Sequence, residues 1–288
     1  MDTTTRIEHA LTNAIGQAER PGCPPKLIAA MRHAVFPRGA RIRPRLCLAV
    51  AIACGDDEPT SSTAAAAAIE LLHCASLVHD DLPCFDDADI RRGLPSVHRA
   101  FGESLAVLTG DALIVLAFQT LARASPVPRN LASLLLSISA GVGTPRGIVA
   151  GQAWECEPIV DLCNYHRLKT GALFAASTMA GAAAADSDPA RWRALGEKIG
   201  EAFQVADDIR DVTATSAELG KPSGRDSALG RPSAVQELGL NGALQRLEQL
   251  VGGAIASIPP CRGAAELRSL IMLEAKRLVP SKLAQRAA

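Results

Sequence analysis

Apolar residues recur at helical spacing along most of this chain, and few stretches alternate between β-branched and polar residues as a strand would. Alanine and leucine, both strong helix formers, supply most of these apolar positions. We therefore expect an all-α fold. The pattern predicts helices over residues 4–19, 25–35, 43–54, 61–80, 103–124, 130–141, 162–184, 189–211, 233–238, 242–256 and 264–278.

Proline and glycine interrupt this pattern at the predicted joins, for example at residues 20–22, 37–39 and 220–224. The composition does not shift anywhere in a way that would mark a domain boundary. A chain of 288 residues could form one large domain or two smaller ones. A single domain over residues 1–288 is the simplest expectation, with the runs at 64–68 and 182–185 marking close helix packing.

Charge is balanced, because Lys plus Arg and Asp plus Glu each count 30. This balance argues against a nucleic-acid binder, which usually carries a basic excess. Any phosphate chemistry must then come from local charge. The eight cysteines include no CxxC pair, and we expect buried thiols. The first residues lack the order of a signal peptide and no uninterrupted apolar run reaches membrane-spanning length, so we expect a cytoplasmic enzyme of bacterial type without a transmembrane segment.

The first chemical feature is residues 79–93, where five aspartates and two arginines follow a strongly apolar helical stretch. Asp80 and Asp81 fall at the C-terminal end of that predicted helix, where the helix dipole disfavours anions. These carboxylates therefore do not stabilise the helix. We expect bound cations to compensate their charge.

The second feature is residues 203–211, which hold another aspartate pair with a third aspartate after it. On a helix Asp207 and Asp211 share one face, with Gln204 a turn earlier. Two such clusters facing one cavity would form an oxygen-rich site of the kind that Mg²⁺ prefers, completed by substrate phosphate oxygens. Taken singly, each cluster could be a solvated helix end. Two clusters, each directly after an apolar helical run, favour the metal site.

Both clusters resemble the aspartate-rich motifs of the trans-type polyprenyl diphosphate synthases, and most closely those of bacterial geranylgeranyl diphosphate synthases of carotenoid-type pathways. The resemblance covers essentially the whole chain and implies a type I isoprenoid synthase bundle of helices around a central cavity. It also implies about three Mg²⁺ ions bridged to the allylic diphosphate. The implied metal ligands are Asp80, Asp81 and Asp86 in the first motif, DDxxxxD, and Asp207, Asp208 and Asp211 in the second, DDxxD.

The resemblance further assigns residues to the two diphosphate substrates. Arg91 corresponds to an arginine that contacts the allylic diphosphate, and Arg92 to one that contacts isopentenyl diphosphate; a planar guanidinium suits phosphate oxygens. Arg43 and His73 also correspond to isopentenyl diphosphate ligands. The other implied binding residues are Lys169, Thr170, Gln204, Lys221 and Arg231, and the implied catalytic groups are Asp80, Asp81, Asp207, Asp208, Lys169 and Lys221.

Two positions that matter for phosphate binding depart from the family pattern GGKRLRP. Ala40 replaces its lysine and Arg38 replaces its first glycine, so one phosphate-binding cation is missing from its usual place. We hypothesise that Arg38 or Arg41 compensates. His73 alone could equally be read as a core histidine, and an Arg-Arg pair alone as solvated surface.

The implied chemistry is ionisation of the allylic diphosphate, attack by the alkene of isopentenyl diphosphate, and loss of a proton, with the released pyrophosphate as the base. Residue size upstream of the first motif should then set product length. Farnesyl-specific bacterial members tend to carry an aromatic residue where this chain has Ala75, followed by Ser76. These small side chains, with the inserted Pro83 and Cys84, favour geranylgeranyl diphosphate. Ala75 could instead simply pack against another helix.

Three alternatives remain open at this stage. The first is a synthase of the same family that makes farnesyl diphosphate or a longer chain. The second is a class I terpene cyclase, against which Arg43, His73 and Arg92 argue because a cyclase needs no second diphosphate site. The third is a non-catalytic subunit, which would typically lack an aspartate motif. The resemblance implies a homodimer, and leaves open the allylic starter and the downstream pathway (carotenoid, photosynthetic pigment or diterpenoid).

Overall fold

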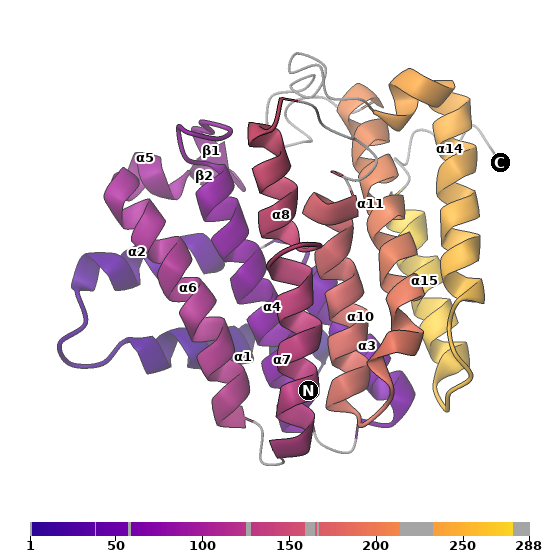
Figure 1. The fold of residues 1–288 in the computed structure, drawn as a ribbon, viewed down its shortest axis with the longest axis horizontal. Coiled ribbons are helices and arrows are strands. Elements are labelled where there is room, and N and C mark those ends of the chain that lie inside the picture. The colour runs from indigo at the N-terminus through magenta and orange to yellow at the C-terminus, as the bar shows by residue number, and fades with distance from the viewer. Residues whose placement is uncertain are drawn as a thin grey trace.

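The computed structural model describes residues 2–37, 39–56, 59–124, 128–158, 165, 167–213 and 233–278. The predicted all-α class is confirmed (Figure 1). The α-helices are α1 (Thr3–Ala18), α2 (Pro25–Val35), α3 (Ile42–Cys54), α4 (Pro59–Asp80), α5 (Val97–Phe101), α6 (Glu103–Ala124), α7 (Pro128–Val142), α8 (Ile148–Ala153), α10 (Ala172–Ala184), α11 (Arg193–Thr213), α14 (Ala234–Ala256) and α15 (Ala264–Leu278). Shorter elements are the helical turns η1 (Trp154–Cys156), η2 (Arg167–Gly171) and η3 (Pro189–Trp192) and the hairpin β1 (Ile90–Arg91) and β2 (Leu94–Pro95).

The long helices run side by side, and α1 and α2 lie across them at one side (Figure 1). Helix α4 packs against α6, α3 and α10, and α10 in turn packs against α7, α3 and α11. Both α4 and α10 are buried along most of their length. These two helices therefore form the centre of the bundle.

Small side chains allow the central helices to approach closely. Ala64 to Ala68 are all buried in α4, and Ala182 to Ala184 are buried in α10, as the alanine runs predicted. A Cβ atom at Gly181 would overlap the carbonyl oxygen of Cys47, so glycine is required where α10 meets α3. The alanine runs thus mark helix packing.

Local signals explain where several helices begin and end. Asp2 caps α1 by accepting hydrogen bonds from the backbone N–H groups of Thr4 and Thr5. Helix α3 ends at Gly55, which adopts the left-handed conformation (φ 95°) that glycine tolerates best. Gly239 (φ 68°) breaks the long segment α14. This break agrees with the prediction of two helices, 233–238 and 242–256.

The ends of α4 and α11 lie at the same end of the bundle, the upper end in Figure 1, where the β1–β2 hairpin and α8 also lie. Asp80 is the last residue of α4, and the second aspartate cluster lies in the last turns of α11. The fold therefore brings to one end two acidic segments that are far apart in sequence.

The expectation of buried thiols holds only in part. All seven described cysteines are free, and Cys47 and Cys74 are buried. Cys84 and Cys156 are exposed, so the expectation is wrong for these two. Both lie in short segments next to the acidic site, which the helical pattern does not describe.

Two helices, α4 and α6, are long and apolar enough to cross a membrane by length and composition alone. This result differs from the expectation based on uninterrupted apolar runs. In α4 the apolar window is 78% buried inside the fold, as in a core helix. In α6 only 39% of the window is buried, and Val107, Leu108 and Val115 are exposed.

Candidate active site

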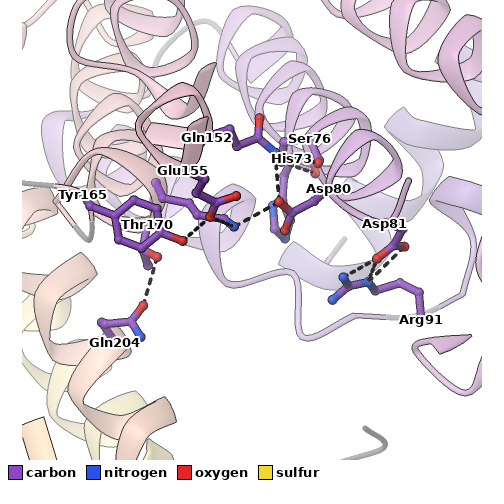
Figure 2. Close-up of polar contacts among 11 residues, drawn as sticks. His73, Ser76, Asp80, Asp81, Arg91, Gln152, Glu155, Tyr165, Thr170 and Gln204 are labelled. Atoms are coloured by element: carbon purple, nitrogen blue, oxygen red, sulfur yellow. Dashed lines mark hydrogen bonds and ion pairs between the residues drawn. The ribbon is translucent and has the colours of Figure 1, made fainter. Parts of the chain in front are cut away.

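Asp80 lies at the centre of a polar network at the end of α4 (Figure 2). Lys169 Nζ, from η2, lies 3.0 Å from Asp80 Oδ1 and 2.6 Å from Glu155 Oε1. Gln152 Nε2, from α8, donates to Asp80 Oδ1 at 3.3 Å and to the carbonyl oxygen of Ser76 at 3.2 Å. The hydroxyl of Tyr165 donates to Glu155. Residues from α4, α8, η1 and η2 therefore meet around one lysine ammonium.

Asp81 forms a separate ion pair with Arg91 from the hairpin (Figure 2). Arg91 Nε lies 3.0 and 3.2 Å from the two carboxylate oxygens, and Nη2 contacts Oδ1. The side chain of Asp81 is buried, and burial raises the pKa of its carboxyl even though Arg91 acts in the opposite direction. Arg91 and Lys169 thus compensate the negative charge of Asp81 and Asp80. From the sequence we expected bound cations to do so.

The loop after α4 folds back over the end of the helix. The backbone N–H of Asp86 donates to the carbonyl oxygen of Asp80 at 2.9 Å, and that of Ala88 donates to the carbonyl oxygen of Asp81 at 3.2 Å. The inserted Pro83 and Cys84 lie at the exposed tip of this loop. The loop therefore returns Asp86 to the pair of aspartates that precede it.

Gln204 connects the second cluster to the lysine segment, and Figure 2 shows its contact with Thr170. The hydroxyl of Thr170 donates to Gln204 Oε1 at 3.0 Å. Gln204 Nε2 donates to Asp208 Oδ1 at 3.0 Å, and the backbone N–H of Ala234 donates to Asp208 Oδ2 at 2.8 Å. Both oxygens of Asp208 accept hydrogen bonds from the protein. Asp208 thereby joins α11 to the start of α14.

Two glycines allow these segments to lie close together. A Cβ atom on Gly151 of α8 would lie 2.5 Å from the backbone nitrogen of Lys169. A Cβ atom on Gly200 of α11 would lie 2.7 Å from Cα of Gly171 in η2. Because a larger side chain would force these backbones apart, glycine at both positions fixes the lysine segment between α8 and α11.

Arg43, His73 and Arg92 form a cluster of basic side chains, which we call the basic pocket. Arg43 Nη1 lies 3.4 Å from His73 Nε2, and the guanidinium stacks 4.3 Å from the ring centre of Phe174. Burial is the main cause that lowers the pKa of Arg43 to about 10. Burial and the nearby arginines also lower the pKa of His73 well below its usual range. Buried Nε of Arg43 has no hydrogen-bond partner among the described residues, so the pocket fits an anion.

Arg41 does not belong to that pocket. It donates to Glu8 at 2.9 Å, to Glu70 at 2.6 Å and to the carbonyl oxygen of Val35 at 2.7 Å, and its side chain is only 3% exposed. Burial alone would lower its pKa, but Glu8 and Glu70 raise it. The hypothesis that Arg41 replaces the missing lysine is therefore wrong, because its donors are engaged inside the protein.

Several predicted residues lie outside the described part of the chain. They are Arg38, Lys221 and Arg231, and their assignments stay predictions. Ala75 is buried at 2% exposure in the central core, and the hydroxyl of Ser76 donates to the carbonyl oxygen of His73 at 2.8 Å. Their role in product length also stays a prediction.

The donor chemistry fits magnesium only together with a substrate. No three Asp, Glu, His or Cys side chains converge on one point among the described residues. Mg²⁺ is commonly held by one or two carboxylates plus phosphate oxygens and waters. The carboxylates of Asp80, Asp81, Asp86, Asp207 and Asp211 are donors of this type, and a diphosphate would have to complete the coordination. Asp208 differs, because both of its oxygens accept hydrogen bonds from the protein, and the assignment of all six aspartates as metal ligands stays a prediction.

The sequence reasoning missed the residues that anchor Lys169 and Arg41, namely Gln152, Glu155, Tyr165 and Glu70. Gln152 and Glu155 stand one turn apart directly after an apolar stretch, a spacing that could have marked a polar helix face. Glu70 interrupts the apolar run of α4 and is 1% exposed. A lone acid within such a run is a signal that a buried partner exists.

Comparisons with known proteins identify the family of this chain. The family model for polyprenyl synthetases matches residues 24–257. The chain is 54% identical over 282 residues to a geranylgeranyl diphosphate synthase of Cereibacter sphaeroides, covering 98% of both chains. It is 49% identical to a geranylgeranyl diphosphate synthase of Rhodobacter capsulatus, covering 97% of both.

Solved structures of geranyltransferases have a similar fold. A geranyltransferase from Helicobacter pylori, complexed with magnesium and isoprenyl diphosphate, superposes with a TM-score of 0.82 at 31% identity, covering 96% of both chains. A geranyltransferase from Legionella pneumophila superposes with a TM-score of 0.79 at 28% identity, covering 96% of this chain and 94% of the other.

Proposed function

The chain belongs to the polyprenyl synthetase family, and on this premise we propose that it condenses isopentenyl diphosphate with an allylic diphosphate to give mainly geranylgeranyl diphosphate. The two bacterial relatives that match it over nearly their whole length carry that name. The allylic substrate would be dimethylallyl, geranyl or farnesyl diphosphate.

The observation that carries this proposal is that two consecutive arginines contact different acidic partners. Arg91 pairs with Asp81 on the acidic side. Arg92, which has a left-handed φ of 53°, lies away from Asp81 in its contacts: Nη2 is 3.7 Å from Glu70, and Nη1 donates to the carbonyl oxygen of Pro37. One dipeptide thereby serves two neighbouring anion sites, and a condensation of two diphosphates needs both.

The acidic side would bind the allylic diphosphate. Lys169 and Arg91 place positive charge where the departing pyrophosphate develops negative charge, and this stabilises the transition state of ionisation. Magnesium, when bound, would supply further charge neutralisation for the leaving group. Thr170 and Gln204 lie beside Lys169 and would orient the same diphosphate through their polar groups.

The basic side would bind isopentenyl diphosphate. Arg43 has an unpartnered buried nitrogen there, and Arg92 and His73 complete the pocket. Holding the alkene beside the ionising carbon replaces an encounter in solution by an oriented reaction. The proton lost from the adduct would pass to the released pyrophosphate.

Product length would depend on α4. Ala75 and Ser76 lie one to two turns before the first aspartate pair, and both side chains are small. A growing chain directed along this helix would meet no bulky residue at these positions. This supports a twenty-carbon product over farnesyl diphosphate.

We further propose a homodimer. Helices α6 and α7 expose apolar side chains, among them Leu108 at 53%, Val115 at 56% and Leu136 at 72%. Exposed apolar residues that gather on neighbouring helices mark an interaction surface. A dimer through this face would bury them, and we place the dimer in the cytoplasm and in carotenoid-type isoprenoid biosynthesis.

The proposal is tested by incubating the purified protein with Mg²⁺, isopentenyl diphosphate and each allylic starter in turn, followed by sizing of the products. A twenty-carbon product supports it. Farnesyl diphosphate as the end product would favour the alternative member of the family. A cyclised hydrocarbon, or no product from any starter, would contradict condensation.

A further inference from the structure

The guanidinium of Arg92 lies directly against the backbone of Gly39. A Cβ atom at position 39 would lie 2.7 Å from Cζ and Nη2 of Arg92 and 3.0 Å from Nε. Cβ atoms in proteins almost never lie this close to another heavy atom. Any side chain at position 39 would therefore displace the guanidinium.

Space rather than backbone conformation explains the glycine. Gly39 does not have a left-handed φ, so an alanine could adopt the same backbone conformation without strain. The atoms that an added methyl group would meet all belong to the far end of one flexible side chain. Substitution by alanine should thus move Arg92 and leave the fold intact.

Two further groups hold the guanidinium in the same place. Arg92 Nη1 donates to the carbonyl oxygen of Pro37 at 3.3 Å, and Nη2 lies 3.7 Å from Glu70 Oε1. Glu70 is buried and is itself fixed by Arg41 at 2.6 Å. Pro37 and Gly39 on one side and Glu70 of α4 on the other therefore lie against the guanidinium of Arg92.

These contacts hold the guanidinium of Arg92 next to the other residues of the basic pocket. Glu70, which lies 3.7 Å from Arg92, stands one turn before His73 on α4, and Arg92 and Arg43 are among the four arginines that lower the pKa of His73. Because Ala40 supplies no cation, the described part of this pocket relies on the guanidinium groups of Arg43 and Arg92. A displaced Arg92 would leave Arg43 as the main charge.

We propose that Gly39 is a positioning residue for isopentenyl diphosphate: its missing side chain provides the space in which Arg92 is held toward the basic pocket. This inference rests on the proposed function, since it takes Arg92 as a ligand of that substrate. Gly39 itself touches no substrate.

The test is Gly39→Ala, assayed by steady-state kinetics with each substrate varied in turn. We expect the KM for isopentenyl diphosphate to rise about tenfold, as for the loss of one charge-assisted contact. The KM for the allylic diphosphate, the kcat at saturation and the thermal midpoint should stay close to wild type. Gly16→Ala is the matched control, because a Cβ atom there meets nothing within 4 Å.

A double-mutant cycle distinguishes positioning from a general effect. Arg92→Ala should raise the KM for isopentenyl diphosphate by itself, and adding Gly39→Ala should cause no further rise. An equal rise in both backgrounds, or an unchanged KM in Gly39→Ala alone, would overturn the inference. A wild-type protein that does not use isopentenyl diphosphate would instead overturn the proposed function.

Discussion

The ammonium of Lys169 lies 3.0 Å from Oδ1 of Asp80 and joins the π-helical turn η2 to the end of α4. The same ammonium lies 2.6 Å from Glu155. Burial alone would lower the pKa of Lys169, but Asp80, Tyr165 and Glu155 raise it, so the lysine keeps its charge at neutral pH. If Asp80 binds a metal as proposed, Glu155 would be left as the carboxylate that holds Lys169.

Glu155→Gln should therefore lower kcat. Without the second carboxylate, Lys169 is less well fixed toward the leaving group, and we expect roughly a tenfold loss with little change in the KM for isopentenyl diphosphate. Glu157→Gln, at an exposed position two residues later, is the matched control. Equal rates for wild type and both variants would show that Glu155 does not position the lysine.

Asp81→Asn should abolish most activity. The variant leaves Arg91 without its charged partner and removes the negative charge of a proposed metal ligand, and we expect kcat to fall by about 10²-fold or more at any Mg²⁺ concentration. Asp89→Asn is the control, since Asp89 is exposed and pairs with Arg99 at the surface. Full activity of Asp81→Asn at saturating Mg²⁺ would contradict the assignment of the first motif.

Binding of isopentenyl diphosphate should take up a proton at His73. In the free enzyme, burial and nearby arginines depress the pKa of His73, so the imidazole is neutral at pH 7. The incoming anion offsets the positive charge of these arginines and raises that pKa, which favours protonation. Affinity should accordingly increase as the pH falls toward about 6, relative to a His73→Gln variant that cannot respond.

Calorimetry in buffers of different ionisation enthalpy measures this proton uptake directly. Comparison with His73→Gln removes the contribution of the diphosphate itself, which also titrates. Identical proton uptake in both proteins would show that His73 does not respond to the substrate.

Ala75→Tyr should shorten the product toward farnesyl diphosphate. Ala75 is 2% exposed on α4, and under the proposed role of this helix a phenol ring at position 75 would block the path of the growing chain. Product chromatography measures the ratio of fifteen- to twenty-carbon products. Ser76→Ala, which keeps a small side chain, should leave the ratio unchanged; an unaltered profile in Ala75→Tyr would refute this role of α4.

Arg41→Ala should destabilise the protein strongly. It leaves Glu70 buried without the partner that lies 2.6 Å away, and breaking a buried pair from one side costs about 3–5 kcal/mol in the free energy of unfolding. Arg246→Ala breaks an exposed pair with Glu201 and should cost less than about 1 kcal/mol. Similar denaturation midpoints for the two variants would contradict the structural role of Arg41.

The sequence predicted the long helices well because their signals are local. The predicted limits of α2, α6 and α15 agree with the structure, and Pro25 begins α2 where proline is favoured. The segments α5, α8 and the β1–β2 hairpin were missed, since each is too short to show a period. Within predicted helix 162–184, the described residues 167–171 form a π-helical turn.

A sequence motif can nominate site residues, and here it nominates the aspartates and arginines. It cannot predict the contacts of a side chain whose hydrogen-bond or ion-pair partner is distant in sequence. Arg41 is a candidate phosphate ligand in the sequence because it follows Ala40, where the family lysine is missing. In the structure it is engaged by Glu8 and Glu70, which come from α1 and α4. The sequence gives no sign that these three side chains meet. Glu155 was missed for the same reason, since Asp80 and Lys169 give it its role only through tertiary packing.

The most direct test of condensation at two neighbouring diphosphate sites is a single-turnover assay with Mg²⁺, labelled isopentenyl diphosphate and farnesyl diphosphate. We predict a twenty-carbon allylic diphosphate from the wild type, and a loss of this product when either Asp81→Asn or Arg92→Ala is introduced. Turnover of farnesyl diphosphate without incorporation of the label, or unchanged incorporation in both variants, would contradict the account.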